Sequence, residues 1–394
     1  MAIKAIDLFS GCGGVSCGLT LAGFKVKAAV EIENSAADTY HNYPLLADVN
    51  ILRKDICKVT GKELYKASCI KKDELYLLAG CPPCQNFSMQ NPKNKKKTET
   101  ERKKLLFEYL RIIEEMYPPF ILMENVPGIA TEFNKPILDE FIGRLENENG
   151  IDSEKYFVRK KVLNAADYGV PQIRKRFVLH GVRMDIYREL QTCGMDFDLP
   201  APTHNIHGFN NLLPWVTVRQ AIGDLPAINA GEEYKGPNGR IHNHKCADLS
   251  DVNIQKIQYI RDHGGSRDCL PDDMTLECHK KKDTDGKNFG GHKDVYGIMN
   301  PDRPSPTMTG GCLCYTKGRY GHYTQDRAIS IREAARFQTF PDDFLFSNNL
   351  GEAALQIGNA VPVKLVEASA SEIMKSIKAL RHKRRKKHAA GVNL

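Results

Sequence analysis

Short apolar runs alternate with segments of helical spacing along the first 182 residues. Residues 3–9 form an apolar run that ends in Ser-Gly-Cys-Gly-Gly, and residues 15–22 then follow a helical pattern. Further strands are predicted at 27–32, 55–56, 75–79, 120–123 and 177–180, with a helix at 105–115. Because strands that alternate with helices are typical of a parallel sheet, the pattern predicts an α/β fold in this region.

The pattern changes after this region. From residue 200 to about 326 the chain is rich in Gly, Pro, Asn, Asp and His, and its periodic segments are short. Helical signals return at 330–338 and at 363–380, where apolar residues form a stripe at helical spacing. We therefore predict a first domain at 1–182, a loop-rich domain at 183–326, a return to the first domain at 327–380 and a basic tail at 381–394.

Composition places the chain among ordinary globular proteins, with 394 residues of which 41% are hydrophobic and 26% charged. No stretch approaches the roughly 18 apolar residues of a membrane span, and the N-terminus lacks the layout of a signal peptide. We therefore expect a cytoplasmic protein without a membrane partner. Its 12 cysteines are scattered through a chain without an export signal, so reduced thiols are expected.

The net positive charge is concentrated in the C-terminal tail. The formal net charge is +8, and the run from Arg381 to Lys387 contains six Lys and Arg residues, so the rest of the chain is nearly balanced. Such a tail either follows a phosphate backbone or is a solvated end. Residues 91–104 are also rich in lysine and are interpreted as a mobile loop.

A glycine turn and an acidic residue predict a nucleoside site. Gly11, Gly13 and Gly14 lie between the first predicted strand and a helix, where backbone amides can approach a ligand closely. Glu31 lies at the end of the second strand, about 20 residues further on, where an acid can bind ribose hydroxyls. Dinucleotides and S-adenosylmethionine both fit this pattern.

The segment Cys81-Pro-Pro-Cys84-Gln85 has three interpretations. A zinc site would need a second ligand pair of suitable spacing, and a redox pair is typical of a helix start in a small domain. The third interpretation is a nucleophilic thiolate at the carboxyl edge of the sheet. Glu124, Arg174 and Arg176 would lie at the same edge if the sheet is parallel.

These segments together resemble the DNA cytosine-5 methyltransferase family over nearly the whole chain. The matching segments, in chain order, are Asp7-Leu-Phe-Ser-Gly-Cys-Gly-Gly14, Glu31, Asp55-Ile56, Gly80-Cys-Pro-Pro-Cys-Gln-Asn-Phe-Ser88, Glu124-Asn-Val126, Gln172-Ile-Arg-Lys-Arg176, Arg332-Glu-Ala-Ala-Arg336 and Gln356-Ile-Gly-Asn-Ala-Val-Pro362. The resemblance implies a Rossmann-like S-adenosylmethionine-dependent methyltransferase domain and a smaller, loop-rich target recognition domain.

The resemblance also implies a role for each matched residue. Cys84 would add to carbon 6 of a cytosine, while Glu124 binds N3 and Arg176, with Arg174 nearby, orients Glu124 and contacts O2. The cofactor residues would be Phe9, Gly11, Gly13, Glu31, Ile32, Asp55, Ile56, Pro83, Leu105, Asn359 and Val361. The DNA contacts would be Gln85, Ser88, Arg102 and Thr307.

The family further implies that the target cytosine is flipped out of double-stranded DNA and that S-adenosylhomocysteine is released, without a metal. We expect a monomer that acts alone or is functionally paired with a restriction endonuclease without direct contact. A transfer-RNA cytosine-5 methyltransferase would use the same nucleophile. A nicotinamide-dependent oxidoreductase and a non-catalytic DNA-binding protein are the alternatives from other classes.

Overall fold

The computed structural model of the chain describes residues 2–83, 98–146, 155–236, 241–280 and 294–389. The chain forms two compact units. The first comprises Met1–Tyr168, Lys175–Thr203 and Val361–Leu394, and the second comprises Gly169–Arg174 and His204–Ala360. Segment 327–360, which we expected to return to the first domain, packs within the second unit, because the buried Arg332 donates a hydrogen bond to the carbonyl of His242 (2.8 Å). The roles assigned to the predicted domains remain predictions.

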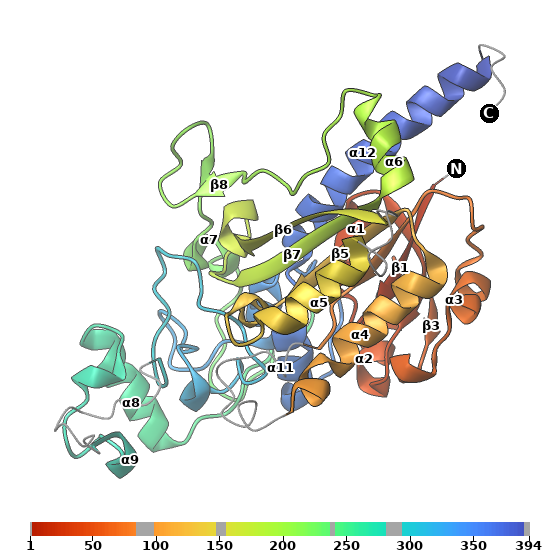
Figure 1. Cartoon of the computed structure of the whole chain (residues 1–394). Coiled ribbons are helices and arrows are strands. Elements are labelled where there is room, and N and C mark those ends of the chain that lie inside the picture. The colour runs from red at the N-terminus through yellow and green to blue at the C-terminus, as the bar shows by residue number, and fades with distance from the viewer. Residues whose placement is uncertain (1, 84–97, 147–154, 237–240, 281–293, 390–394) are drawn as a thin grey trace. The chain divides into compact units, whose positions relative to one another are not determined.

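A seven-stranded sheet forms the centre of the first unit (Figure 1). Its strands are β1 (Ile3–Leu8), β2 (Phe24–Val30), β3 (Asn50–Leu52), β4 (Tyr76–Gly80), β5 (Phe120–Asn125), β6 (Tyr156–Asn164) and β7 (Lys175–Arg183). The order across the sheet is β3-β2-β1-β4-β5-β7-β6. The α/β fold with a Rossmann-like core that we predicted is therefore confirmed.

Two details of the sheet differ from the prediction. Strand β7 runs antiparallel to β5 and β6, because the connection from β6 to β7 is too short for the crossover that a parallel pair requires. The predicted strand at 55–56 is also wrong. The third strand is Asn50–Leu52, and Asp55 instead caps a short 3₁₀ turn, Ile56–Lys58, by accepting a hydrogen bond from the Cys57 amide.

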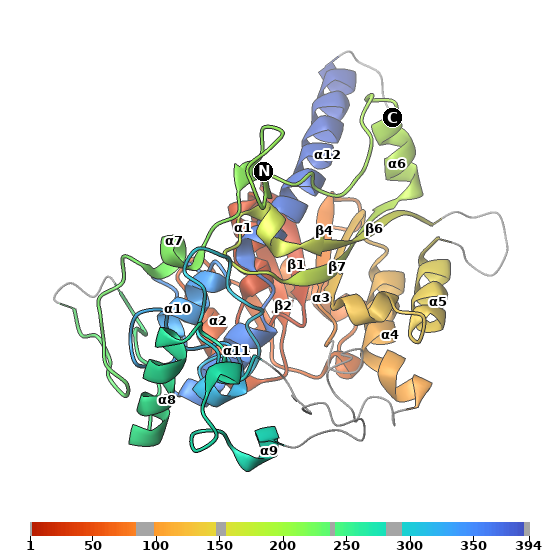
Figure 2. The same cartoon turned by 90° about the vertical axis from the view of Figure 1, so that its left-hand side faces the viewer.

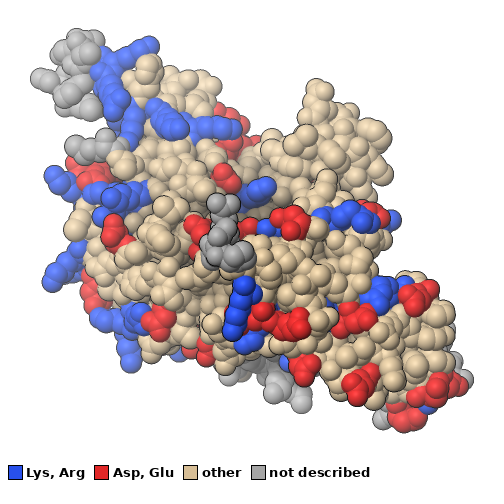
Figure 3. Space-filling view, turned by 180° about the vertical axis from the view of Figure 1, so that it is seen from behind, with Lys and Arg blue, Asp and Glu red and all other residues tan. Residues whose placement is uncertain are grey.

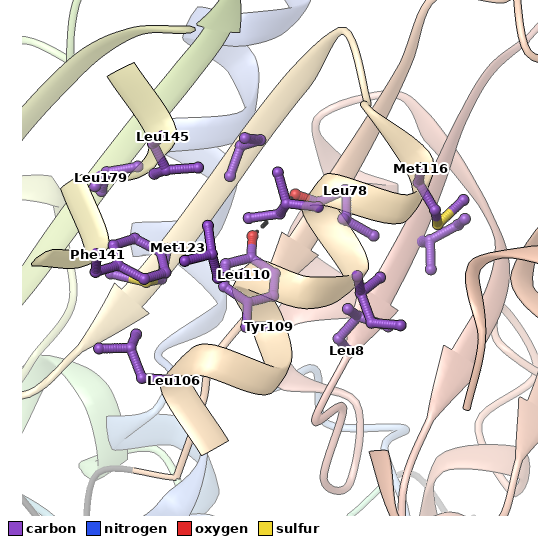
Figure 4. Close-up of a cluster of buried hydrophobic side chains, with 14 of the residues drawn as sticks. Leu8, Leu78, Leu106, Tyr109, Leu110, Met116, Met123, Phe141, Leu145 and Leu179 are labelled. Carbon is purple, nitrogen blue, oxygen red and sulfur yellow. Dashed lines mark hydrogen bonds between the residues drawn. The ribbon is translucent and has the colours of Figure 1, made fainter. Parts of the chain in front are cut away.

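Helices of the first unit cover both faces of the sheet. They are α1 (Gly14–Leu21), α2 (Asn34–His41), α3 (Gly61–Ser68), α4 (Glu99–Met116), α5 (Lys135–Glu146), α6 (Met184–Gln191) and α12 (Val363–Ala389). Helices α4 and α5 bury one apolar face against β1, β4, β5 and β7 (Figure 4). On the other face α1 packs against α12 so closely that a Cβ on Gly18 would lie 2.5 Å from that of Val366. This large common core fixes the carboxyl ends of the strands.

Tyr109 of α4 ties two strands together. Its hydroxyl lies 3.3 Å from the carbonyl oxygen of Leu78 and 3.1 Å from that of Leu122, and therefore bridges β4 and β5 (Figure 4). The ring lies against Gly80, where a Cβ would come within 2.6 Å of it. Glycine at the end of β4 is thus required for this packing, which positions the start of segment 81–83.

Helix α4 begins at Glu99, so the predicted mobile loop at 91–104 is wrong for its last residues. Residues 91–97 lie outside the described part of the chain. Helix α12 continues through the basic run to Ala389, although its predicted end was residue 380. Near that end Lys383 donates a hydrogen bond to Thr192, and Arg384 forms an ion pair with Glu189 (2.6 Å), so α12 lies beside the end of α6 (Figures 1 and 2).

The second unit has little regular structure (Figure 2). Its elements are β8 (His204–Asn205), β9 (Leu213–Pro214), α7 (Val218–Ile222), α8 (Asp251–Asp262), α9 (Glu277–Lys280), α10 (Ile331–Phe337) and α11 (Leu350–Asn359). A buried ion pair between Arg327 and Glu333 (2.7 Å) stands at the start of α10, where Ser330 and Glu333 form a capping box. Hydrogen-bonded polar side chains therefore help to hold this loop-rich unit together.

Candidate active site

The glycine turn follows β1 directly and is shaped by residues with positive φ. Phe9 (60°), Gly11 (54°) and Gly13 (103°) all adopt the left-handed region, which glycine enters without strain. A Cβ on Gly11 would meet no atom within 4 Å, whereas one on Gly13 would lie 2.9 Å from Leu46. A side chain at position 13 would thus clash with its neighbours, whereas the space beside Gly11 is open to a ligand.

Glu31 is held immediately after β2 by backbone groups. One carboxylate oxygen accepts a hydrogen bond from the Gly11 amide (2.7 Å), and the other accepts one from the Glu33 amide (2.8 Å). Glu31 is 9% exposed, so its orientation is fixed while its remaining lone pairs can accept from hydroxyl donors. A carboxylate in this position fits the ribose of a nucleoside.

Several residues predicted to contact the cofactor follow the ends of β1, β2 and β3. Ile32 follows Glu31 and is 59% exposed, which is unusual for a large apolar side chain next to a buried strand. Phe9 is half-buried against the core. Asp55 accepts from the Cys57 amide (3.0 Å), and this hydrogen bond holds the pKa of Asp55 below its usual value. Ile56 is buried in the core.

The remaining predicted cofactor residues have varied environments. Leu105 packs at the rim of the core, Pro83 is exposed, and Val361 is buried in the first unit. Asn359 is exposed at the end of α11, in the second unit. The structure thus places Phe9, Gly11 and Glu31 together in the first unit, and the roles of all these residues remain predictions.

Glu124 at the end of β5 lies between two partners. Arg176 Nε lies 2.8 Å from its Oε1 and forms an ion pair with it. Cys81 Sγ donates to Oε2 at 2.8 Å. Glu124 is only 7% exposed, so both partners hold a buried carboxylate at the carboxyl edge of the sheet that also carries Glu31.

Asn125 joins this carboxylate to the segment that precedes Cys84. Its side-chain amide donates to the carbonyl of Pro82 (3.1 Å), and the residue is fully buried. The sequence suggested only a zinc site or a redox pair for Cys81, and no role of its own for Asn125. The position of both residues within the matched segments could have indicated a role for them. Their contacts could not be predicted, because these depend on the pairing of β4 with β5.

Several predicted residues cannot be placed in this way. Cys84, Gln85 and Ser88 lie outside the described residues, and Arg102 lies in the first turns of α4. Arg174 lies in the second unit, where its guanidinium donates to the carbonyls of Met308 (2.6 Å) and Gly358 (2.9 Å). Thr307 donates to the carbonyl of Ile173 (2.8 Å) in the same unit.

In the described part of the chain, no three or more His, Cys, Asp and Glu side chains are grouped so as to hold a metal ion. Within the same residues, no helix is long and apolar enough to cross a membrane.

Comparison with known proteins agrees with the class of enzyme that this edge of the sheet suggests, a nucleoside-dependent transferase. Residues 3–375 match the C-5 cytosine-specific DNA methylase family. The chain therefore belongs to the C-5 cytosine-specific DNA methylase family and is a DNA (cytosine-5) methyltransferase.

Two named relatives cover nearly the whole chain. The type II methylase M.HgiDII of Herpetosiphon aurantiacus is 34% identical over 98% of this chain and 99% of its own length. The type II methyltransferase M1.HphI of Haemophilus parahaemolyticus is 33% identical over 95% of this chain and 87% of its own.

Two solved structures share the fold at lower identity. One, from a prophage of E. coli, is assigned as a DNA modification methyltransferase; it has a TM-score of 0.63 at 24% identity and covers 96% of this chain and 100% of its own. The Dnmt2 methyltransferase of S. pombe has a TM-score of 0.57 at 16% identity, with 95% and 99% covered.

Proposed function

We propose that this enzyme transfers the methyl group of S-adenosylmethionine to carbon 5 of a flipped-out cytosine within a specific sequence of double-stranded DNA, through a covalent bond between Cys84 and carbon 6. The observation that carries the proposal is the buried Glu124 carboxylate, held by Arg176 and Cys81 at the edge that also carries Glu31. The same edge of the sheet therefore carries an acidic side chain that could contact the cytosine ring and a site that could hold a nucleoside.

The chemistry requires both an acid and a nucleophile. Carbon 5 of cytosine is a poor nucleophile, so a thiolate first adds to carbon 6, and the ring then becomes an enamine that can accept an alkyl group. Glu124 would deliver a proton to N3, so that negative charge does not build up in the ring as the Cys84 bond forms. Arg176 keeps the carboxylate in place. After methyl transfer a base removes the proton from carbon 5, and the electrons of that bond expel Cys84 from carbon 6.

The cofactor residues support S-adenosylmethionine as the donor. Glu31 would bind the ribose hydroxyls, Ile32 and Phe9 would contact the adenine, and the open space beside Gly11 would receive the methionine portion. When bound, S-adenosylmethionine supplies a methyl group that is already activated as a sulfonium, so the proposed reaction needs no metal.

The names of the relatives support a place in DNA modification. We propose that the enzyme modifies the recognition site of a type II restriction-modification system, or acts as a solitary methylase, in the cytoplasm and as a monomer. Any companion endonuclease would recognise the same DNA sequence without contacting the methyltransferase. Residues 183–326 would contain the target recognition domain, with Gln85, Ser88, Arg102 and Thr307 at the DNA.

The substrate can be tested with labelled S-adenosylmethionine, supplied with either duplex DNA or transfer RNA. We expect label in DNA, and bisulfite sequencing of a plasmid that carries the gene should show protected cytosines in one sequence context. Label in transfer RNA alone would overturn the choice of DNA and favour the alternative enzyme.

The mechanism can be tested with a duplex that contains 5-fluorocytosine at the target position. Fluorine blocks the final elimination, so Cys84 should remain bonded to the DNA, and mass spectrometry should find the crosslink on that residue. Cys84→Ser should give no crosslink and no methylation but should still bind the duplex. Turnover without a crosslink in the wild-type enzyme would contradict the covalent mechanism.

A further inference from the structure

A basic surface lies at the amino edge of the central sheet, opposite the edge that carries Glu31 and Glu124. It is formed where the last turns of α12 pass the start of β1. We call this surface the basic edge and define it by Lys378, Arg381, His382 and Arg385 around Ala2. Lys and Arg side chains crowd the end of α12 in Figure 3.

Two hollows flank the basic edge and share Ala2, Arg381 and Arg385. One, of about 430 Å³, is also lined by Lys378 and His382. The other, of about 400 Å³, is lined also by Lys4 and Arg384. The two arginines therefore stand between two recesses, each large enough for a small anionic group such as a phosphate.

Acidic side chains near the hollows offset only part of this charge, and Glu74 acts on Arg381 as well as on Lys4. Glu74 lines the second hollow and is bound to Lys4 (3.0 Å), and Glu189 binds Arg384 on the side of α12 that faces α6. Burial and the nearby charge of Arg385 lower the pKa of Arg381. An anion between Arg381 and Arg385 would relieve this repulsion.

The apolar residues in the lining favour a polyanion over a membrane surface. Ile3, Leu75 and Met374 line the hollows but are each less than 9% exposed. A membrane-binding surface needs exposed apolar side chains beside its basic ones. Arginine guanidinium groups over recesses match phosphate oxygens.

We propose that the basic edge binds the phosphate backbone of a duplex DNA segment other than the one that carries the target cytosine. The choice of DNA rests on the proposed function. The six residues of β1 separate the two edges of the sheet by about 20 Å, roughly a strand rise of 3.3 Å for each residue, so the basic edge lies at the opposite ends of the strands from the proposed catalytic edge. The second contact would raise affinity for DNA without a target site and assist transfer between segments of long DNA.

The test compares two double variants of α12. Arg381→Gln with Arg385→Gln removes two charges of the basic edge, and Lys375→Gln with Lys383→Gln removes two charges of α12 that line neither hollow. Lys378→Gln is a milder third variant at an exposed position. Thermal melting followed by circular dichroism checks that each variant is folded.

Binding is measured on a long duplex without the target sequence over a range of salt concentrations. For the basic-edge variant we expect the slope of log affinity against log salt to become shallower by about 1 to 2, and the affinity to fall roughly tenfold, because two phosphate contacts are lost. The control pair should keep the wild-type slope. Equal slopes in all proteins, or equal losses in both pairs, would overturn the proposal.

Substrate length gives a second readout. Methylation of a duplex of about 14 base pairs with one site should be unchanged in the basic-edge variant, whereas methylation of a long plasmid should slow. Loss of binding to hairpin RNA or phosphatidylserine vesicles, with DNA binding intact, would refute a DNA ligand. Failure of the wild-type enzyme to methylate the short duplex would count against the proposed function, while the salt slope is measured without turnover.

Discussion

Cys81 is the residue whose contact most directly affects the proposed chemistry. Its thiol donates to Glu124, the group that would protonate N3. Cys81→Ser keeps a donor, so we expect near wild-type methylation, whereas Cys81→Ala should lower kcat by about fivefold, since one hydrogen bond to a carboxylate is worth roughly 1 kcal/mol. Single-turnover methylation of one duplex by the three proteins measures this. Identical rates for Ser and Ala would show that the contact has no catalytic effect.

Glu124 itself should be far more sensitive. Glu124→Gln keeps the size of the side chain but cannot deliver the proton, so we expect methylation to fall by about 10² to 10⁴. Binding of the target duplex should change little, which electrophoretic mobility shift can check. A Gln variant that methylates at the wild-type rate would exclude Glu124 as the acid.

Ser369 of α12 gives a prediction for stability alone. It is 1% exposed, its hydroxyl has no hydrogen-bond partner among the described residues, and it lines a cavity of about 10 Å³ with Val15 and Glu124. Because an unpaired buried hydroxyl is costly, Ser369→Ala should raise the free energy of unfolding by about 1 kcal/mol.

A second buried serine provides the control for Ser369. Ser68 donates to the carbonyl of Leu64 (2.6 Å), so Ser68→Ala should lower the free energy of unfolding. Urea denaturation of the two variants compares them directly. A loss of stability in both would contradict this account of Ser369.

At the scale of elements, β7 carries a buried titratable group. His180 is fully buried and contacts the carbonyl of Asp198 (3.1 Å), and burial lowers the pKa of His180 to about 4. The unfolded chain takes up the proton near pH 6.5 and the folded chain only near pH 4. Stability should therefore fall as the pH drops through this window, by up to about 3 kcal/mol from this group.

Urea denaturation at a series of pH values tests His180. His180→Leu should make the curve flatter between pH 6.5 and 4, while the buried His322, whose pKa burial also lowers to about 4, retains part of the slope. An unchanged curve for the Leu variant would place the acid sensitivity elsewhere.

The sequence predicted the elements whose signal is local. Apolar runs located β1, β4 and β5, and the helical signal at 330–338 located α10. The antiparallel β7 and the turn at Asp55 were not predictable in this way, because both depend on which strands become neighbours. The length of α12 was not predictable for the same reason, because its last turns are held by contacts of Lys383 and Arg384 with the end of α6.

The residues of the site, like the elements of the fold, were predicted only where the signal is local. The matched segments located Glu31, Glu124 and Arg176, and the structure brings Arg176 to Glu124. They did not reveal that Cys81 and Asn125 contact the same region, since hydrogen bonds between strands leave no pattern along the chain. For the same reason the limits of the two units could not be derived from composition.

At the scale of the whole molecule, a bound cofactor should stabilise the entire folded chain. S-adenosylhomocysteine at about 100 times its Kd would add roughly 2.7 kcal/mol, which for 394 residues corresponds to a rise in Tm of about 3 °C. Glu31→Ala should abolish most of this rise, because the ribose hydroxyls lose their acceptor. Differential scanning fluorimetry with and without ligand measures both proteins, and an equal rise in the variant would remove Glu31 from the site.

The last two residues of β5 have a consequence for any effort to redesign this enzyme. Glu124 is the proposed acid, while Asn125 donates a hydrogen bond to the carbonyl of Pro82, two positions before Cys84 in the chain. One hydrogen bond thus ties the end of β5 to the segment that leads to Cys84. Transplanting either segment into a relative without the other should misalign both reagents at once.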